Sequence, residues 1–471
     1  MIRPLIGGGS SECKASDENV GKRRCKHLLC SCSANSLKVI NLIQDNGGEA
    51  YLVGGCVRDM VLKEKPHDED LTTSLTPDKV IELFESKGYK VIPTGLQHGT
   101  VTVMIDGEGY EITTFRKETT YSDNRHPDEV IFSDSVEDDC SRRDFTFNAM
   151  YYDGKEIIDT YGGQKDIEDK VIRTVGDPDE RFNEDALRML RAIRFSSKLG
   201  FTIDPKIIKS IKKNKKLIHN ISMERITSEL TKTVQGPNRR YALQQLQKTG
   251  LLKEIIPELD RLKSVKQKSK YHYEDAFEHT LSVMDNCPSD DHQVQFAAMF
   301  HDLGKGTTKQ VDADGTEHFK GHSTDSAKMA DAICKRMKMP TADRKTITKL
   351  VKNHDRPESE EHPRRSAAKF VYEHQDFSDK EFQQIQHLWI ADRKAHVNAN
   401  EKSLAAFNKE LNTILAGPHR INDLSVKGND LIELGYKGRD VGRAQEFLLK
   451  KSLADNTNDK DQLIKFLNGF K

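Results

Sequence analysis

Two short segments near the start of the chain most constrain its fold and chemistry: VGGCVRD at 53–59, followed by KPHDEDLTT at 65–73. Side chains alternate along a strand, so Asp68 and Asp70 share one face if the second segment is a strand. Two carboxylates on one face suit a shared divalent cation. Upstream, the glycine backbone can approach a phosphate closely and the Arg58 guanidinium can pair with its oxygens. The combination indicates transfer of a nucleotidyl group from a triphosphate.

Neither segment is decisive alone, because acidic turns often contain Asp-x-Asp and Gly-Gly is more often a tight turn. Their order and spacing resemble the head of the polymerase-beta-like nucleotidyltransferases. Between Tyr51 and Phe201 the chain also resembles one branch of that superfamily, the bacterial class II tRNA nucleotidyltransferases or CCA-adding enzymes. The segments that carry this resemblance are TGLQHGTVTV (94–103), EITTFR (111–116), RHPDEVIF (125–132), EDDCSRRDFTFNAM (137–150) and RFNEDALRMLRAIRF (181–195).

This resemblance implies addition of CCA to tRNA 3′ ends, without a nucleic-acid template, from CTP and ATP. Asp68 and Asp70 are then the catalytic ligands of Mg²⁺, an ion that prefers oxygen donors and phosphate substrates. Glu111 is either a third carboxylate of this site or an exposed strand residue. The expected partners are tRNA, CTP and ATP, with no DNA and no membrane.

The resemblance also implies a set of nucleotide-binding residues: Gly55, Arg58, Arg142, Asp185, Arg188, Arg191 and Arg194. Arg142 could instead simply pair with Asp138 or Asp139. Asp185 and Arg188 stand three residues apart and would share a helix face. Cytosine and adenine both present an amine donor beside a ring-nitrogen acceptor, which a carboxylate plus a guanidinium complements, whereas uracil and guanine present the opposite order.

A second constellation in the C-terminal half resembles the ligand set of HD-type phosphohydrolases: His279, His301, Asp302 and Asp392, with His322 and His354 as further candidates. Imidazoles and carboxylates together favour a divalent transition metal, whose identity the sequence does not give. Lys305 is a candidate phosphate contact. Some CCA-adding enzymes with such a domain have phosphatase and cyclic phosphodiesterase activity, which the resemblance permits here.

At 471 residues, the chain is long enough for about three domains. Alternating strand-like and helical patterns up to about residue 160, then helical periodicity throughout, predict an α+β fold. The expected parts are a leader (1–35), a small α/β nucleotidyltransferase head (36–160), a helical neck and body that binds nucleotide and tRNA (161–265), an HD domain (266–400) and a helical tail (401–471).

Composition narrows the class of protein. Basic and acidic residues balance at 74 each, so a nucleic-acid surface has to arise from local clusters. No apolar run approaches the length of a membrane span, and the eight cysteines follow no secretory leader, which predicts a soluble cytoplasmic protein with reduced thiols. Cys13, Cys25, Cys30 and Cys32, with His27, fit no closed zinc pattern well and favour a disordered leader.

Three rival functions stay open at this point. A bacterial poly(A) polymerase shares the head and neck, but TGLQHGT and the absence of a GRRF-like run favour the CCA enzyme. Partial addition, of CC or A alone, is a second rival, and the full-length FRKETTYSDNRHP loop at 115–127 argues against the CC version. The third is an HD phosphohydrolase whose head only binds nucleotide or tRNA, which would not need Asp68 and Asp70.

Overall fold

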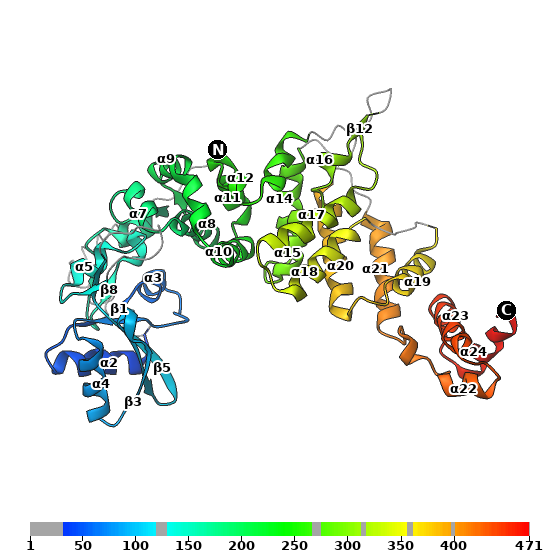
Figure 1. Ribbon diagram of the computed structural model, residues 1–471, viewed down its shortest axis with the longest axis horizontal. Helices are drawn as coiled ribbons and strands as arrows, with labels where there is room; N and C mark the ends of the chain where they lie inside the picture. Colours follow the sequence, from blue (N-terminus) through cyan, green and yellow to red (C-terminus); the bar gives the residue numbers. More distant parts are fainter. Residues whose placement is uncertain are drawn as a thin grey trace, which may run out of the picture. The chain divides into compact units, whose positions relative to one another are not determined.

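The computed structural model describes residues 32–118, 130–265, 275–311, 317–355, 361–396 and 401–470. The cysteines before Cys32 and most of the 115–127 loop lie outside these residues. The chain forms two compact units, one ending at Ile221 and one running from Ser222 onward, with Ser197–Leu199 joining the second. A sheet in the first unit and helices in the second confirm the predicted α+β fold (Figure 1). The finer domain boundaries remain predictions.

A seven-stranded mixed sheet, in the order β3-β4-β5-β2-β1-β8-β9, organises the first unit. β2 runs parallel to β5, whereas β1 pairs antiparallel with both β2 and β8. The strands are β1 (Ala50–Val53), β2 (Leu71–Thr73), β3 (Lys90–Gly95), β4 (Thr100–Ile105), β5 (Glu108–Thr114), β8 (Tyr151–Tyr152) and β9 (Ile157–Ile158). The strand-like patterns predicted before about residue 160 are thereby confirmed.

Sequence alternation explains why these segments become half-buried strands. In β4, Val101, Val103 and Ile105 are buried while the intervening residues are partly exposed, the pattern of a sheet with one face on the core. Helix α2 (Ala34–Asp45) contributes Val39, Ile40 and Ile43, all fully buried. The core of the unit therefore lies where this helix meets the sheet, at β1.

Short helices and strands complete the first unit. They are α3 (Gly55–Val61), α4 (Pro77–Ser86), α5 (Val136–Ser141), α6 (Gly163–Asp169), α7 (Pro178–Glu184), the start of α8 (Leu187–Leu199) and α9 (Pro205–Asn214), with β6 (Arg116–Glu118), β7 (Val130–Phe132), β10 (Val171–Ile172) and β11 (Thr202–Ile203). Three helices, α4, α7 and α9, begin with Pro in the first turn, where its missing N–H costs nothing.

The second unit is helical apart from the short strands β12 (Gln310–Val311) and β13 (Glu317–His318). Its helices are α10 (Met223–Gln235), α11 (Arg239–Thr249), α12 (Leu251–Ile255), α13 (Pro257–Asp260), α14 (Ala276–Asn286), α15 (His292–Phe300), α16 (Lys305–Thr308), α17 (His322–Arg336), α18 (Thr341–Lys352), α19 (Pro363–Glu373), α20 (Asp379–Ala395), α21 (Glu401–Leu415), α22 (Gly428–Glu433), α23 (Arg439–Asp455) and α24 (Lys460–Phe466). Helices α14, α15, α17, α18 and α20 pack into one bundle (Figure 1).

Among the helices in the described ranges, none is both long enough and apolar enough to span a lipid bilayer.

Candidate active site and metal centre

The two predicted metal-binding carboxylates lie in the connection between α3 and β2. The strand begins at Leu71, after both aspartates, because the ladder to β1 starts with the Leu52–Leu71 pair, so the expectation that Asp68 and Asp70 share one face of a strand is wrong. Asp68 and Asp70 are both exposed. The backbone of Asp70 is nevertheless fixed, since its carbonyl accepts a hydrogen bond from Val53 N at 3.0 Å.

Sheet register brings Glu111 to the same place. Leu71 pairs with Ile112 across the parallel strands β2 and β5, so the preceding residues, Asp70 and Glu111, also lie side by side. Desolvation and then the Glu111 charge raise the pKa of Asp70, Asp68 adds to this, and Arg143 opposes it. Exposed carboxylates that disfavour one another's charge provide the oxygen donors that Mg²⁺ prefers. These residues fit a divalent cation.

The Gly-Gly pair makes the turn from β1 into α3. Gly54 has φ +75° and ψ −125°, a conformation that a side chain would strain. Gly55 begins the helix, and Arg58 follows on its buried side. The Arg58 guanidinium donates to Asp59 Oδ1 at 2.6 and 2.8 Å and to Asn148 Oδ1 at 3.0 Å. Intramolecular partners therefore hold this predicted phosphate contact in one orientation.

Arg142 forms an ion pair with Asp139. Asp139 is one of the two acidic residues that the sequence offered as an alternative partner to a triphosphate. Arg142 Nε lies 2.9 Å from Asp139 Oδ1, and Arg143 Nη2 lies 2.9 Å from Asp139 Oδ2. Tyr151 Oη donates to the same carboxylate at 2.6 Å. Although burial opposes its charge, the two arginines lower the pKa of Asp139 to about 2. A permanent anion thus fixes both arginines while Arg142 keeps partial solvent access.

The predicted common helix of Asp185 and Arg188 is interrupted. Asp185 has an extended backbone, with φ −138° and ψ 104°, and separates α7 from α8. Its carboxylate Oδ1 accepts a hydrogen bond at 3.0 Å from the N–H of Leu187, the first residue of α8, so it satisfies one of the unpaired donors at the start of that helix. The expectation that both side chains lie on one continuous helix face is therefore wrong, because Asp185 instead caps the helix that carries Arg188.

The three arginines of α8 contact different partners. Arg188 is buried and donates to Glu184 Oε2 at 2.5 Å and to the Arg142 carbonyl at 2.7 Å. Arg191 forms two contacts with Asp144 Oδ2, at 2.5 and 2.8 Å. The Arg194 guanidinium lies 4.1 Å from the centre of the Phe195 ring. The helix thereby lies against the Arg142 segment, which brings two parts of the predicted nucleotide-binding set together.

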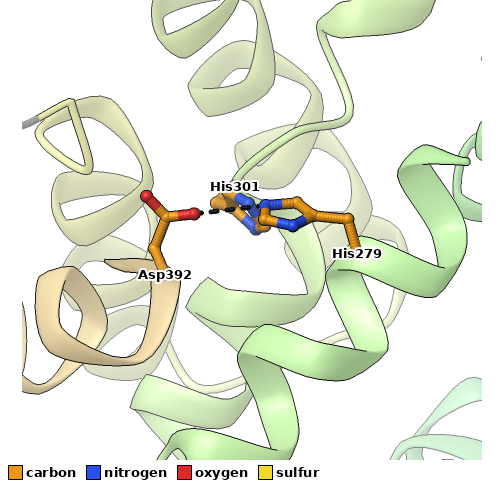
Figure 2. Close-up of side chains that lie close together, drawn as sticks. All are labelled: His279, His301 and Asp392. Carbon is orange, nitrogen blue, oxygen red and sulfur yellow. Dashed lines mark hydrogen bonds and ion pairs between the residues drawn. The ribbon is translucent and has the colours of Figure 1, made fainter. Parts of the chain in front are cut away.

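The HD constellation comes together inside the helical bundle. His279 on α14, His301 directly after α15 and Asp392 on α20 place their donor atoms within 4.8 Å of one another (Figure 2). Asp302, His322 and His354 form a second group with the same spacing. All the candidate ligands of the HD constellation thus fall into two neighbouring triads.

Asp302 belongs to the second triad and also contacts the histidines of the first. Its Oδ2 is 3.1 Å from His301 Nε2 and 3.7 Å from His279 Nε2. Its Oδ1 is 3.4 Å from His322 Nε2 and 3.8 Å from His354 Nε2. One carboxylate therefore offers an oxygen to each side. Lys305 Nζ also contacts Oδ2, at 2.6 Å.

Backbone carbonyls fix the orientation of three imidazoles. The Nδ1 atoms of His301, His322 and His354 lie 2.7 to 2.9 Å from the carbonyls of Ala298, Phe319 and Val351. Donation from Nδ1 leaves Nε2 with its lone pair directed at the cluster, the arrangement usual for metal-bound histidine.

Two buried polar atoms in this cluster, His301 Nε2 and Asp302 Oδ2, have no hydrogen-bond partner of good geometry. Burial works against each charge, yet the contact with Asp302 raises the pKa of His301, and His301 and Lys305 lower that of Asp302. Burial and the charge of His301 lower the pKa of His354 to about 4. Nitrogen and oxygen donors held in this way fit a divalent transition metal.

Sequence reasoning missed two neighbours of these sites. Arg143 forms an ion pair with Asp139, and its charge lowers the pKa of Asp70. The Arg-Arg-Asp triplet was the signal for it in the sequence. His396 stacks on His279 with ring centres 5.3 Å apart and lies 3.7 Å from Asp392 Oδ1. Its position four residues after Asp392 on a helix was the available signal.

Three protein families match successive parts of the chain. Residues 50–173 match the Poly A polymerase head domain, residues 200–263 the probable RNA and SrmB-binding site of polymerase A, and residues 273–393 the HD domain.

Curated relatives match about half of the chain. The CCA-adding enzyme of Lactobacillus helveticus is 47% identical over 221 residues, and that of Bacillus subtilis is 48% identical over 222 residues. Each alignment covers 47% of this chain, and 54% or 55% of the relative. The chain thus spans about half the length of the curated relatives it matches.

The fold match extends further. The Bacillus stearothermophilus CCA-adding enzyme, solved in complex with CTP, aligns with a TM-score of 0.68 and 27% identity over 92% of this chain and 97% of that enzyme. Residues 50–173 are therefore similar to Poly A polymerase head domains, and the chain has the fold of the CCA-adding enzymes, as its sequence resemblance predicted.

Proposed function

We propose that this protein adds CCA to the 3′ ends of tRNA from CTP and ATP. The observation that carries the proposal is the convergence of Asp68, Asp70 and Glu111 at the β2–β5 pair, directly beside the Gly54–Gly55 turn. The names of the relatives support CCA addition over poly(A) synthesis, and the CTP bound to the Bacillus stearothermophilus enzyme supports the donor.

In this reaction the 3′ hydroxyl attacks the α-phosphate of the bound nucleotide, and pyrophosphate leaves on the opposite side. Bound Mg²⁺ would supply charge neutralisation on the phosphates. Asp68 and Asp70 would hold it, with Glu111 as the third carboxylate. Arg142, which Asp139 fixes, would contact the triphosphate, and Asp185 with Arg188 would read the base edge.

Transcripts of tRNA that end before CCA, after C and after CC test this function with each labelled NTP in turn. We expect CMP on the first two substrates, AMP on the third, and neither UMP nor GMP. Asp68→Ala or Asp70→Ala should abolish incorporation while tRNA binding is retained. Glu64→Ala, an exposed acid of the same connection, is the matched control. Incorporation of AMP alone would identify an A-adding enzyme, and normal activity of either aspartate variant would refute the assignment.

The second unit supports a second activity, metal-dependent phosphoester hydrolysis. The specific observation is the pair of neighbouring triads joined by Asp302, with Nδ1 of three imidazoles held by backbone carbonyls. A bound transition metal would supply Lewis-acid activation of a phosphate and a water of lowered pKa. Lys305, beside Asp302, would contact the phosphate. Hydrolysis of 2′,3′-cyclic phosphates after loading with Mn²⁺, Ni²⁺ or Zn²⁺ tests it.

We place both activities in the cytoplasm. Cys56, Cys140, Cys287 and Cys334 are buried free thiols, which suits a reducing compartment.

A further inference from the structure

Glu69, the central residue of Asp68-Glu69-Asp70, has its carboxylate bound by helix α2. Ser33 N donates to Glu69 Oε1 at 2.8 Å, and Ser33 Oγ donates to Oε2 at 2.6 Å. Ser36 Oγ makes a further short hydrogen bond to Oε2. Hydrogen bonds to a carboxylate are among the stronger ones in proteins, so three of them tie Glu69 firmly to the start of this helix.

The anchor itself is rigid. Ser33 is the N-cap of α2, and its Oγ accepts from Ser36 N at 3.1 Å. Ser36 is fully buried. The helix beyond it packs its apolar side into the core beside β1. A displacement of Glu69 would therefore require either breaking the cap or moving a packed helix.

The segment is consequently fixed from two directions. The Asp70 carbonyl is bound by Val53 N of β1, and the next residue enters the β2 ladder. Glu69 is bound by α2, away from Glu111. The same division appears on β5, where Tyr110 Oη lies 3.5 Å from Ser33 Oγ, while the neighbouring residue Glu111 acts on Asp70.

From this geometry we propose that Glu69 is a positioning residue for the divalent cation of the first unit: its bonds to α2 hold Asp68 and Asp70 toward Glu111. The proposal rests on the proposed nucleotidyl-transfer function. Three carboxylates at one place repel one another, so the connection would relax outward without an anchor. Supporting hydrogen bonds around metal ligands commonly change metal affinity by about 10- to 100-fold.

The test compares Glu69→Ala, Glu69→Gln and the control Glu64→Ala in the full chain. Binding of Mn²⁺ is followed by electron paramagnetic resonance. The part of the binding curve that is lost in the double variant Asp68→Ala/Asp70→Ala is assigned to the site in the first unit and called the head phase. The HD site is the same in every variant, so a difference in Mn²⁺ binding between variants reflects the site in the first unit. We expect Glu69→Ala to weaken the head phase about tenfold and Glu64→Ala to leave it unchanged.

Glu69→Gln should stay within about threefold of wild type, because its amide keeps an oxygen for Ser33 N and a donor that the serine hydroxyls can accept. In CMP transfer, Glu69→Ala should need about tenfold more Mg²⁺ for half-maximal rate and recover most of kcat at saturating Mg²⁺.

Equal Mn²⁺ midpoints for Glu69→Ala and Glu64→Ala would overturn the proposal. It would also be overturned if Glu69→Gln bound Mn²⁺ as weakly as Glu69→Ala, because the charge of Glu69 and not its hydrogen bonds would then matter. If Glu69→Ala melts below the assay temperature, Ser36→Ala replaces it and should give a smaller shift in the same direction; no shift would overturn the proposal. A wild-type protein that transfers no CMP would refute the proposed function separately, because the Mn²⁺ measurement still tests Glu69.

Discussion

Asp185 Oδ1 accepts a hydrogen bond from Leu187 N at the start of α8, and the role proposed for this side chain is to read the base edge. We predict that Asp185→Asn keeps the cap but presents an amide donor where cytosine and adenine need an acceptor. Selectivity for CTP and ATP over UTP and GTP should fall about tenfold in competition assays, consistent with the loss of roughly one hydrogen bond.

Glu180→Gln is the matched control, an exposed acid on the preceding helix α7. Unchanged selectivity and rate in Asp185→Asn would reduce Asp185 to a helix cap.

His301 and His354 should differ in the proton that metal binding displaces. The contact with Asp302 outweighs burial and raises the pKa of His301 above its usual value of 6.5, whereas burial and the His301 charge lower that of His354 to about 4. In the metal-free protein His301 therefore keeps its proton to a higher pH than His354 does. A metal must displace that proton.

We predict that filling the His279, His301 and Asp392 triad releases protons, and that this release decreases as pH rises because His301 then binds fewer protons before the metal arrives. Calorimetric titration of Zn²⁺ or Mn²⁺ in buffers of different ionisation enthalpy measures the number of protons released. The affinity of this triad for metal should rise with pH until His301 has lost its proton. Proton release that is independent of pH would contradict the assignment.

At the scale of elements, the short helix α5 carries much of the electrostatic organisation of the first unit. It holds Asp139, fully buried, between Arg142, Arg143 and the Tyr151 hydroxyl. A carboxyl whose pKa falls to about 2 on folding stabilises the folded state above its unfolded pKa of about 3.9, and this contribution is lost as pH falls toward 2.

Asp139→Asn should therefore destabilise the first unit by about 2 kcal/mol at pH 7. The difference from wild type should shrink below pH 4, as the wild-type carboxyl gains its proton. Urea unfolding followed by tyrosine circular dichroism measures the change. The single tryptophan, Trp389, lies on α20 of the second unit, and its fluorescence transition should not move. A difference that stays constant with pH would argue against the ion pairs.

At the scale of the whole molecule, the two sites belong to different compact units. Asp68, Asp70 and Glu111 lie in the first, and both histidine triads lie in the second. We predict that His301→Ala with Asp302→Ala removes bound transition metal and hydrolysis of 2′,3′-cyclic phosphate, yet leaves CCA addition within a few-fold of wild type. Elemental analysis and the two assays on one preparation measure this.

The reciprocal variant, Asp68→Ala with Asp70→Ala, should retain hydrolysis and metal content. Trp389 fluorescence checks that the second unit of the histidine variant is folded. A loss of CCA addition greater than about tenfold in that folded variant would show that the sites are coupled.

Local sequence patterns predicted the α+β architecture and the strands around the head. The apolar alternation of β4 and the Gly54 turn depend on neighbouring residues, so the chain itself specifies them. The order of histidines and aspartates likewise indicated the candidate HD ligands, whose side chains the structure brings together. In each case the residue types and their spacing carry the physical constraint.

Tertiary structure decided which groups meet. Strand pairing, 41 residues apart in sequence, brought Glu111 to Asp70, and no local pattern encodes that register. The spacing of residues predicted one continuous helix through Asp185, whereas the extended backbone of Asp185 separates α7 from α8. Packing of several helices divided the candidate HD ligands into two neighbouring triads, one of which contains Asp302. Sequence specified the chemistry available at each position, whereas non-local contacts determined its partners.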